Sequence, residues 1–216
     1  MSEILNKQYI LFFKNDINIE FDNLSVKLKE KLGQSIATQI LPIPQDAPAE
    51  IPRLILNYAK YNINISRNRV ELPCKDLDNS LDILIDIVKV LTNQFSVIFN
   101  RIALVSTILV DENLSKLKKI INSDALSSDD ITEIKLRVNK PITLDGFECN
   151  NIEDIEYVTI FMKPDTSPLP QVKKGLVINR DINTFPDKDY RFHDENIPKL
   201  VRSFNNTANS FVIFEK

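Results

Sequence analysis

Short runs in which apolar and polar residues alternate recur along the chain, often in direct succession, and they constrain its fold most. In residues 62–66 and again in 69–73, an isoleucine, valine or leucine occupies every second position. This period of two is typical of half-buried strands. Asparagine tolerates positive φ, so Arg67-Asn68 between the runs predicts a tight hairpin turn. Successive strands joined in this way must pair antiparallel.

Further runs rich in apolar residues predict the rest of the sheet. We expect strands at 9–13, 53–61, 96–110, 131–138, 142–151, 155–162 and 175–185. Asp145-Gly146 predicts a turn. Two proline-dense segments, 42–52 and 163–174, predict ordered loops, because no regular element tolerates that many prolines.

Helical periodicity appears in four places. The clearest stripe spans 76–95, and others span 22–36, 114–121 and 194–214. We expect Asp22 or Ser25 to cap the first helix, with Gly33 near its end. Asp194 or Asn196 is expected to cap the last one, with Pro198 in its first turn.

This order of elements predicts an α+β fold. Its largely antiparallel sheet carries helices packed on one face, including a long central helix and a C-terminal helix. We expect residues 1–216 to form one domain, with a possible weak subdivision near 122–130.

Composition excludes several functional classes. Three isolated glycines cannot build a phosphate-binding loop, and two cysteines cannot form a four-ligand zinc site, so no cofactor is indicated. A net charge of −3 gives no pull toward nucleic acid. No apolar run is long enough to span a membrane. The first residues lack the pattern of an export signal, so we expect a cytoplasmic protein with free thiols.

Two catalytic hypotheses have ordinary structural alternatives. Glu133 and Lys135, with Asp111, could form part of a metal-dependent nuclease site, or they belong to a solvated strand face. His193 lies beside Asp194 and not far in sequence from Ser203 and Ser210. No nucleophile elbow accompanies them, so we expect His193 to be a surface or capping residue.

A ligand-binding hypothesis rests on residues of predicted strands. Arginine binds carboxylate or phosphate with two parallel hydrogen bonds, and Arg67, Arg69, Arg101, Arg180 and Arg191 could converge on an anion.

Alternation along the 175–185 strand places Arg180 on the apolar face and Asp181 and Asn183 on the other. A buried Arg180 needs an acidic partner, for which Glu133, Glu153 and Glu156 are candidates. We expect any ligand site to use Arg180, Asp181, Asn183 and Arg101.

The order of elements also resembles a sporadically distributed bacterial family of uncharacterised proteins. The similarity lies in Asn100-Arg101-Ile102 on the strand after the long helix, and in Arg180-Asp181-Ile182 on a later strand. The family pattern there is Asp-Ile-Asp, whereas this chain has Asp181-Ile182-Asn183. The resemblance implies no activity.

The sequence thus favours a non-enzymatic protein that binds another macromolecule, a protein rather than nucleic acid. Richness in isoleucine and asparagine suggests a low-GC bacterium or its phage, and a defence or toxin–antitoxin setting would suit such a protein. The alternative is a protein that binds a small anionic ligand, or a metal-dependent nuclease, using the polar face of the sheet.

Overall fold

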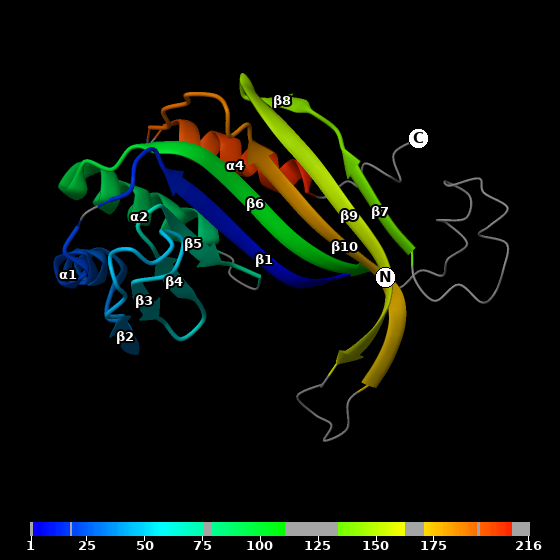
Figure 1. Cartoon of the computed structure of the whole chain (residues 1–216), viewed down its shortest axis with the longest axis horizontal. Helices are drawn as coiled ribbons and strands as arrows, with labels where there is room; N and C mark the ends of the chain where they lie inside the picture. Colours follow the sequence, from blue (N-terminus) through cyan, green and yellow to red (C-terminus); the bar gives the residue numbers. More distant parts are fainter. Residues whose placement is uncertain are drawn as a thin grey trace, which may run out of the picture.

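A computed structural model describes residues 2–17, 19–75, 79–110, 134–162, 171–193 and 195–208. They contain a curved ten-stranded sheet, ordered β2-β3-β4-β5-β1-β6-β10-β9-β7, in which β8 also pairs with β9 (Figure 1). Every pairing is antiparallel. The strands are β1 (Ser2–Phe13), β2 (Ala37–Ile40), β3 (Leu54–Asn57), β4 (Asn62–Ile65), β5 (Arg69–Pro73), β6 (Phe99–Val110), β7 (Ile134–Asn139), β8 (Ile142–Leu144), β9 (Phe147–Met162) and β10 (Gln171–Thr184).

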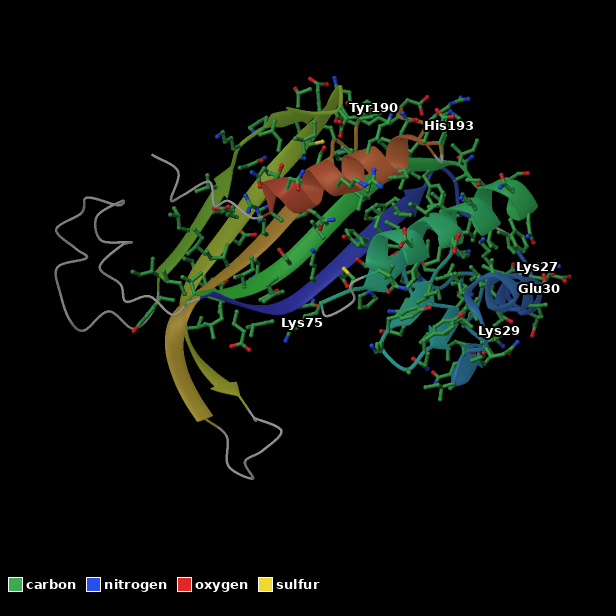
Figure 2. All side chains as sticks on the ribbon, turned by 180° about the vertical axis from the view of Figure 1, so that it is seen from behind. Lys27, Lys29, Glu30, Lys75, Tyr190 and His193 are labelled. Carbon is green, nitrogen blue, oxygen red and sulfur yellow. The ribbon has the colours of Figure 1, made fainter. Side chains whose placement is uncertain are left out.

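Three helices pack against one face of this sheet: α1 (Phe21–Leu32), α2 (Ser80–Phe95) and α4 (Asn196–Thr207). α2 and α4 lie behind the strands in Figure 1 and in front of them in Figure 2. The α+β class, the antiparallel sheet and the C-terminal helix are confirmed. The long central helix is not, because α2 has 16 residues, and residues 76–78 of the predicted helix lie outside the described part.

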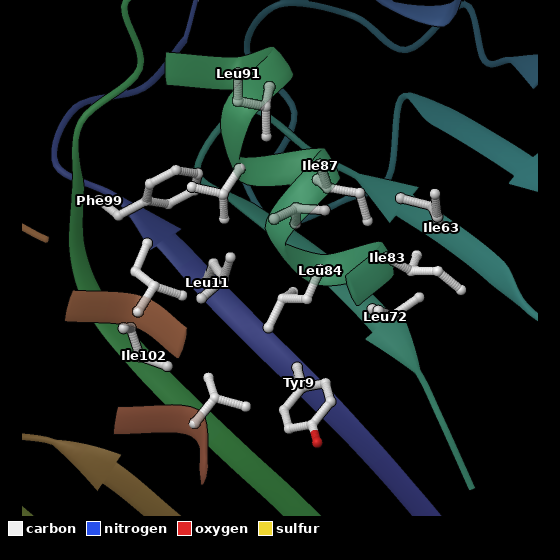
Figure 3. Packing of buried hydrophobic residues seen from close by; sticks show 14 of the residues in the cluster. Tyr9, Leu11, Ile63, Leu72, Ile83, Leu84, Ile87, Leu91, Phe99 and Ile102 are labelled. Atoms are coloured by element: carbon white, nitrogen blue, oxygen red, sulfur yellow. The ribbon is translucent and has the colours of Figure 1, made fainter. Parts of the chain in front are cut away.

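The core fills the space between the helices and the sheet. Leu84, Ile87 and Leu91 of α2 pack over Tyr9 and Leu11 of β1 (Figure 3). Burying one leucine side chain fully stabilises the fold by about 1.5–3 kcal/mol, so this layer of aliphatic side chains dominates the packing energy. A second, smaller cluster lies farther along the same face, and it contains Ile108, Val110, Ile155, Leu176 and Ile178.

The hairpin predicted over 62–73 is confirmed, but its turn has a different chemistry. Asn68 does not adopt positive φ; among described residues other than glycine, only Ser96 and Asp145 do. The Ser66 hydroxyl instead accepts hydrogen bonds from the backbone N–H groups of Asn68 and Arg69. A side-chain turn of this kind removes the need for a left-handed residue.

Helix termini also depart from expectation. Glu20 and Glu195 occupy the N-cap positions of α1 and α4 without a side-chain cap, and Asp194 lies outside the described residues. Gly33 does end α1, with φ of 90° and an N–H bonded to the carbonyl of Lys29. Ile36, expected to extend this helix, lies beyond it and is 74% exposed.

Two arginines hold the proline-dense loop between β2 and β3. The Arg53 guanidinium donates to the carbonyls of Ile43 and Pro44 at 2.6 and 2.9 Å. Arg67 donates to the carbonyls of Gln45 and Ala47 at 2.7 and 3.0 Å. The loop is therefore fixed by side chains where prolines exclude a backbone ladder.

Strand boundaries in the second half were partly mispredicted. The turn at Asp145-Gly146 is confirmed, but the expected strands 142–151 and 155–162 are replaced by short β8 and one continuous β9. Strand β2 was not predicted. Residues 111–133, with the predicted helix at 114–121 and the predicted boundary near 122–130, and most of the second proline loop (163–170) lie outside the described part.

Candidate functional site

The candidate site is the face of the sheet turned away from the helices, called here the open face. In the part of the chain that the structure describes, no helix lies on it (Figure 1). Alternation along β10 assigns its side chains as the sequence predicted. Ile178 and Ile182 join the clusters on the helix side, whereas Asn179 and Asn183 form hydrogen bonds across the opposite side.

A chain of three asparagines crosses the open face. Asn139 Nδ2 donates to Asn150 Oδ1 at 3.1 Å, Asn150 Nδ2 to Asn183 Oδ1 at 3.3 Å, and Asn183 Nδ2 to Asp181 Oδ1 at 2.9 Å. A carboxylate only accepts, so Asp181 fixes the direction of all three bonds. These hydrogen bonds connect β7, β9 and β10 and stabilise their register.

A shallow hollow of about 340 Å³ lies on this face near β7. Its charged lining is balanced: Arg137 Nη1 is 2.7 Å from Asp154 Oδ2, and Lys135 lies opposite Glu156 in the strand register. Beside them, the Thr107 hydroxyl donates to Asn179 Oδ1 at 2.9 Å. Polar groups here bind mainly one another.

Arg101 lies on the same face toward the other end of β6. Its guanidinium carbon is 4.7 Å from the centre of the Phe12 ring. No described residue accepts a hydrogen bond from Arg101 or forms an ion pair with it, and its Nε is shielded from solvent. Arg69, which faces Phe12 from β5, is instead paired with Glu71 at 2.6 Å.

Arg180 is separated from the other three predicted ligand-binding residues. It lies on the helix side, where its Nη2 is 3.1 Å from Glu153 Oε1 and its Nε donates to Asn151 Oδ1 at 3.1 Å. Arg101, Asp181 and Asn183 share the open face, so only these three belong to the candidate site. The five arginines expected to converge do not.

The catalytic hypotheses receive no support from the described residues. His193 is exposed, and its carbonyl accepts the backbone N–H groups of Asn196 and Ile197 at the start of α4. The Ser203 hydroxyl donates to Asp145, not to a histidine. Glu133, Asp111 and Ser210 lie outside the described part. Among the residues that are described, no three His, Cys, Asp or Glu side chains are placed to hold a metal.

Sequence reasoning missed Phe12, Thr107, Asn139 and Asn150 as members of this face. Their contacts depend on the registers of β1 with β6, of β6 with β10 and of β9 with β7 and β10, which no local pattern reveals. The alternation within each strand could have assigned them to a face, but not to one another.

The sequence matches no protein-family model and no curated protein. The resemblance to a sporadically distributed bacterial family therefore stays a prediction. No helix among the described residues is long and apolar enough to cross a membrane.

Proposed function

We propose that this chain is a non-enzymatic protein that binds another protein through the open face of its sheet. One observation carries the proposal: the polar groups on this face are largely satisfied by one another, while apolar side chains between them stay partly exposed. Ile10, Phe12, Val105 and Ile152 are all half-buried. A partner can cover these apolar groups without leaving many buried polar groups unpaired, as in ordinary protein interfaces.

The shape of the face favours a macromolecule over a small ligand. Small-molecule sites are enclosed and bury most of their ligand. The hollow near β7 is open to solvent. The sheet that carries the rest of the face is broad and curved (Figure 1). Such a surface matches side chains of a partner protein better than a small anion.

A nuclease is less well supported than a binding protein. A metal-dependent site needs carboxylates available to a cation. On the open face Asp154 is paired with Arg137, and Glu156 lies opposite Lys135. Among the described residues, this arrangement favours mutual neutralisation of charges over metal binding.

The proposed setting is the cytoplasm of a bacterium, or of a bacterium infected by a phage, with a defence or toxin–antitoxin role as the working hypothesis. Cys74 and Cys149 are both buried and unjoined, and free thiols are typical of proteins in a reducing compartment.

Affinity capture with the full chain tests the proposal. The bait is compared with a Val105→Arg/Ile152→Arg double variant, since both residues flank Asp181, whose carboxylate balances part of the added positive charge. Lys89→Glu, on the exposed side of α2, is the control. We expect one protein to be retained by the wild type and the control but lost from the double variant. Equal retention by all three chains would contradict the proposal.

A further inference from the structure

On the open face, Arg101 is a cation without a carboxylate partner among the described residues. Four arginines lie on described strands, and three of them, Arg69, Arg137 and Arg180, have a carboxylate partner within 3.1 Å. Arg101 has none among the residues that the structure describes, although it is partly buried and its Nε is shielded from solvent. A guanidinium whose outer nitrogens meet no acceptor among the described residues can bind an anion.

The surroundings hold Arg101 in place without neutralising it. The Phe12 ring lies against the guanidinium and so restricts its orientation. Arg69 and Glu71 on the next strand form a neutral pair. Arg69, Phe12 and Arg101 form a row across β5, β1 and β6. Because Glu71 neutralises Arg69, this row keeps the positive charge of Arg101, which a single monoanion would balance.

We propose that Arg101 is the anchor for a carboxylate on the protein partner, an acidic side chain whose neighbour in the partner is apolar. Guanidinium forms a planar fork that matches a carboxylate. The accessible part of that fork is its outer edge, because Nε is covered. Ile10, which is half-buried and lies two residues from Phe12 on β1, would receive the apolar neighbour, because Ala103 opposite it is only 2% exposed.

The charge of the row favours carboxylate over phosphate. One carboxylate brings one negative charge and neutralises Arg101, whereas a phosphate group carries nearly two negative charges at neutral pH. A dianion would leave excess negative charge beside Glu71. This inference rests on the proposed function for the identity of the partner, but not for the anion site itself.

The test is a titration of the ¹⁵N-labelled full chain followed by NMR. Sodium acetate is the probe, with sodium chloride at equal ionic strength as the reference. We expect saturable shifts of the Arg101 Nε–H signal and of the backbone amides of Phe12 and Ala103. Arg101→Gln should weaken acetate binding roughly tenfold or more, since a hydrogen-bonded charge pair is lost. Arg202→Gln, which removes an exposed arginine of α4, should bind acetate as the wild type does.

Each outcome separates this inference from the proposed function. No saturable shift with acetate, or equal binding by Arg101→Gln, overturns the anion site even if a partner is captured through Val105 and Ile152. Tighter binding of inorganic phosphate than of acetate overturns the carboxylate assignment. Acetate binding at Arg101 without any captured protein supports the site and counts against the proposed function. If Arg101→Gln fails to fold, Arg101→Lys serves instead, with weaker but measurable acetate binding expected because the planar fork is lost.

Discussion

The guanidinium of Arg180 lies 3.1 Å from the carboxylate of Glu153, and the two side chains are 1% and 0% exposed. The register of β9 and β10 places the two residues directly opposite each other. With Ser106, which faces Arg180 from β6, they form a polar row between the main core and the smaller cluster around Ile155. The pair is therefore part of the interior and not of the open face.

Arg180→Ala should destabilise the protein strongly. Removing one partner of a buried ion pair leaves the other charge uncompensated, which typically costs about 3–5 kcal/mol. Chemical denaturation measures this loss directly. Partner capture by the chain that remains folded should be unchanged, and a normal melting temperature with lost binding would assign Arg180 to a binding site instead.

Replacing the whole pair should cost much less. In an Arg180→Met/Glu153→Leu variant no charge is left behind, and apolar replacement of buried pairs is often neutral or stabilising. A loss as large as that of Arg180→Ala would mean that the pair contributes net stability beyond mutual neutralisation.

Leu84 and Leu91 are expected to be central to the core. Their side chains are 1% and 0% exposed and face β1 and β6 (Figure 3). Either substitution by alanine should cost roughly 2–5 kcal/mol of unfolding free energy. Lys89→Ala on the exposed side of α2 is the matched control and should change little. A loss below about 1 kcal/mol at both leucines would show that this helix packs differently.

Asn183→Asp should introduce a pH-dependent defect. The new carboxylate would meet that of Asp181, because Asn183 now donates to Asp181 at 2.9 Å. Like charges raise the pKa of the pair in the folded state above its unfolded value. The penalty, about 1–3 kcal/mol, is then present at neutral pH and relieved as the pH falls toward 4. Denaturation at the two pH values measures it; an equal defect at both would exclude charge repulsion as its cause.

Both cysteines should resist labelling in the native protein. Burial raises the pKa of the Cys74 thiol to about 11 and that of Cys149 to about 12. Since the thiolate is the reactive form, a thiol reagent at pH 8 should modify both residues only after unfolding. Mass measurement without reductant should show two labels on the unfolded chain and none on the native one. Rapid labelling of the folded protein would contradict this account.

The raised pKa values of the two thiols also predict how the free energy of unfolding changes at alkaline pH. The folded state holds these protons more tightly than the unfolded chain, whose thiols ionise near pH 9. The stabilising contribution is therefore complete below pH 9 and is lost as the pH rises toward 11 and 12. Replacing both cysteines by alanine should flatten that part of the stability curve.

Features that depend on a few neighbouring residues could be predicted from the sequence. The hairpin over 62–73, the end of α1 at Gly33 and the two faces of β10 follow from alternation and backbone preference. The sequence predicted a break between strands at residues 152–154, yet β9 continues through it. Immediately before these residues, Asn150 and Asn151 bond to Asn183 and Arg180 of β10.

Contacts between distant segments could not be predicted in this way. The sequence offered three acidic partners for Arg180, and only the register of β9 with β10 selects Glu153. Likewise, nothing near Arg101 in the sequence indicates Phe12, which lies beside it because β1 is inserted between β5 and β6.

Photocrosslinking at the centre of the open face tests the central claim most directly. A photoreactive residue replaces Val105 of β6, which lies opposite Asp181 of β10, in the full chain within its native cells. The control chain carries the photoreactive residue in place of Lys89, on the exposed side of α2. The account predicts an adduct with one protein at position 105 and none at position 89. Adducts at position 89 alone, adducts with nucleic acid, or no adduct at position 105 would contradict the claim that this face binds a protein.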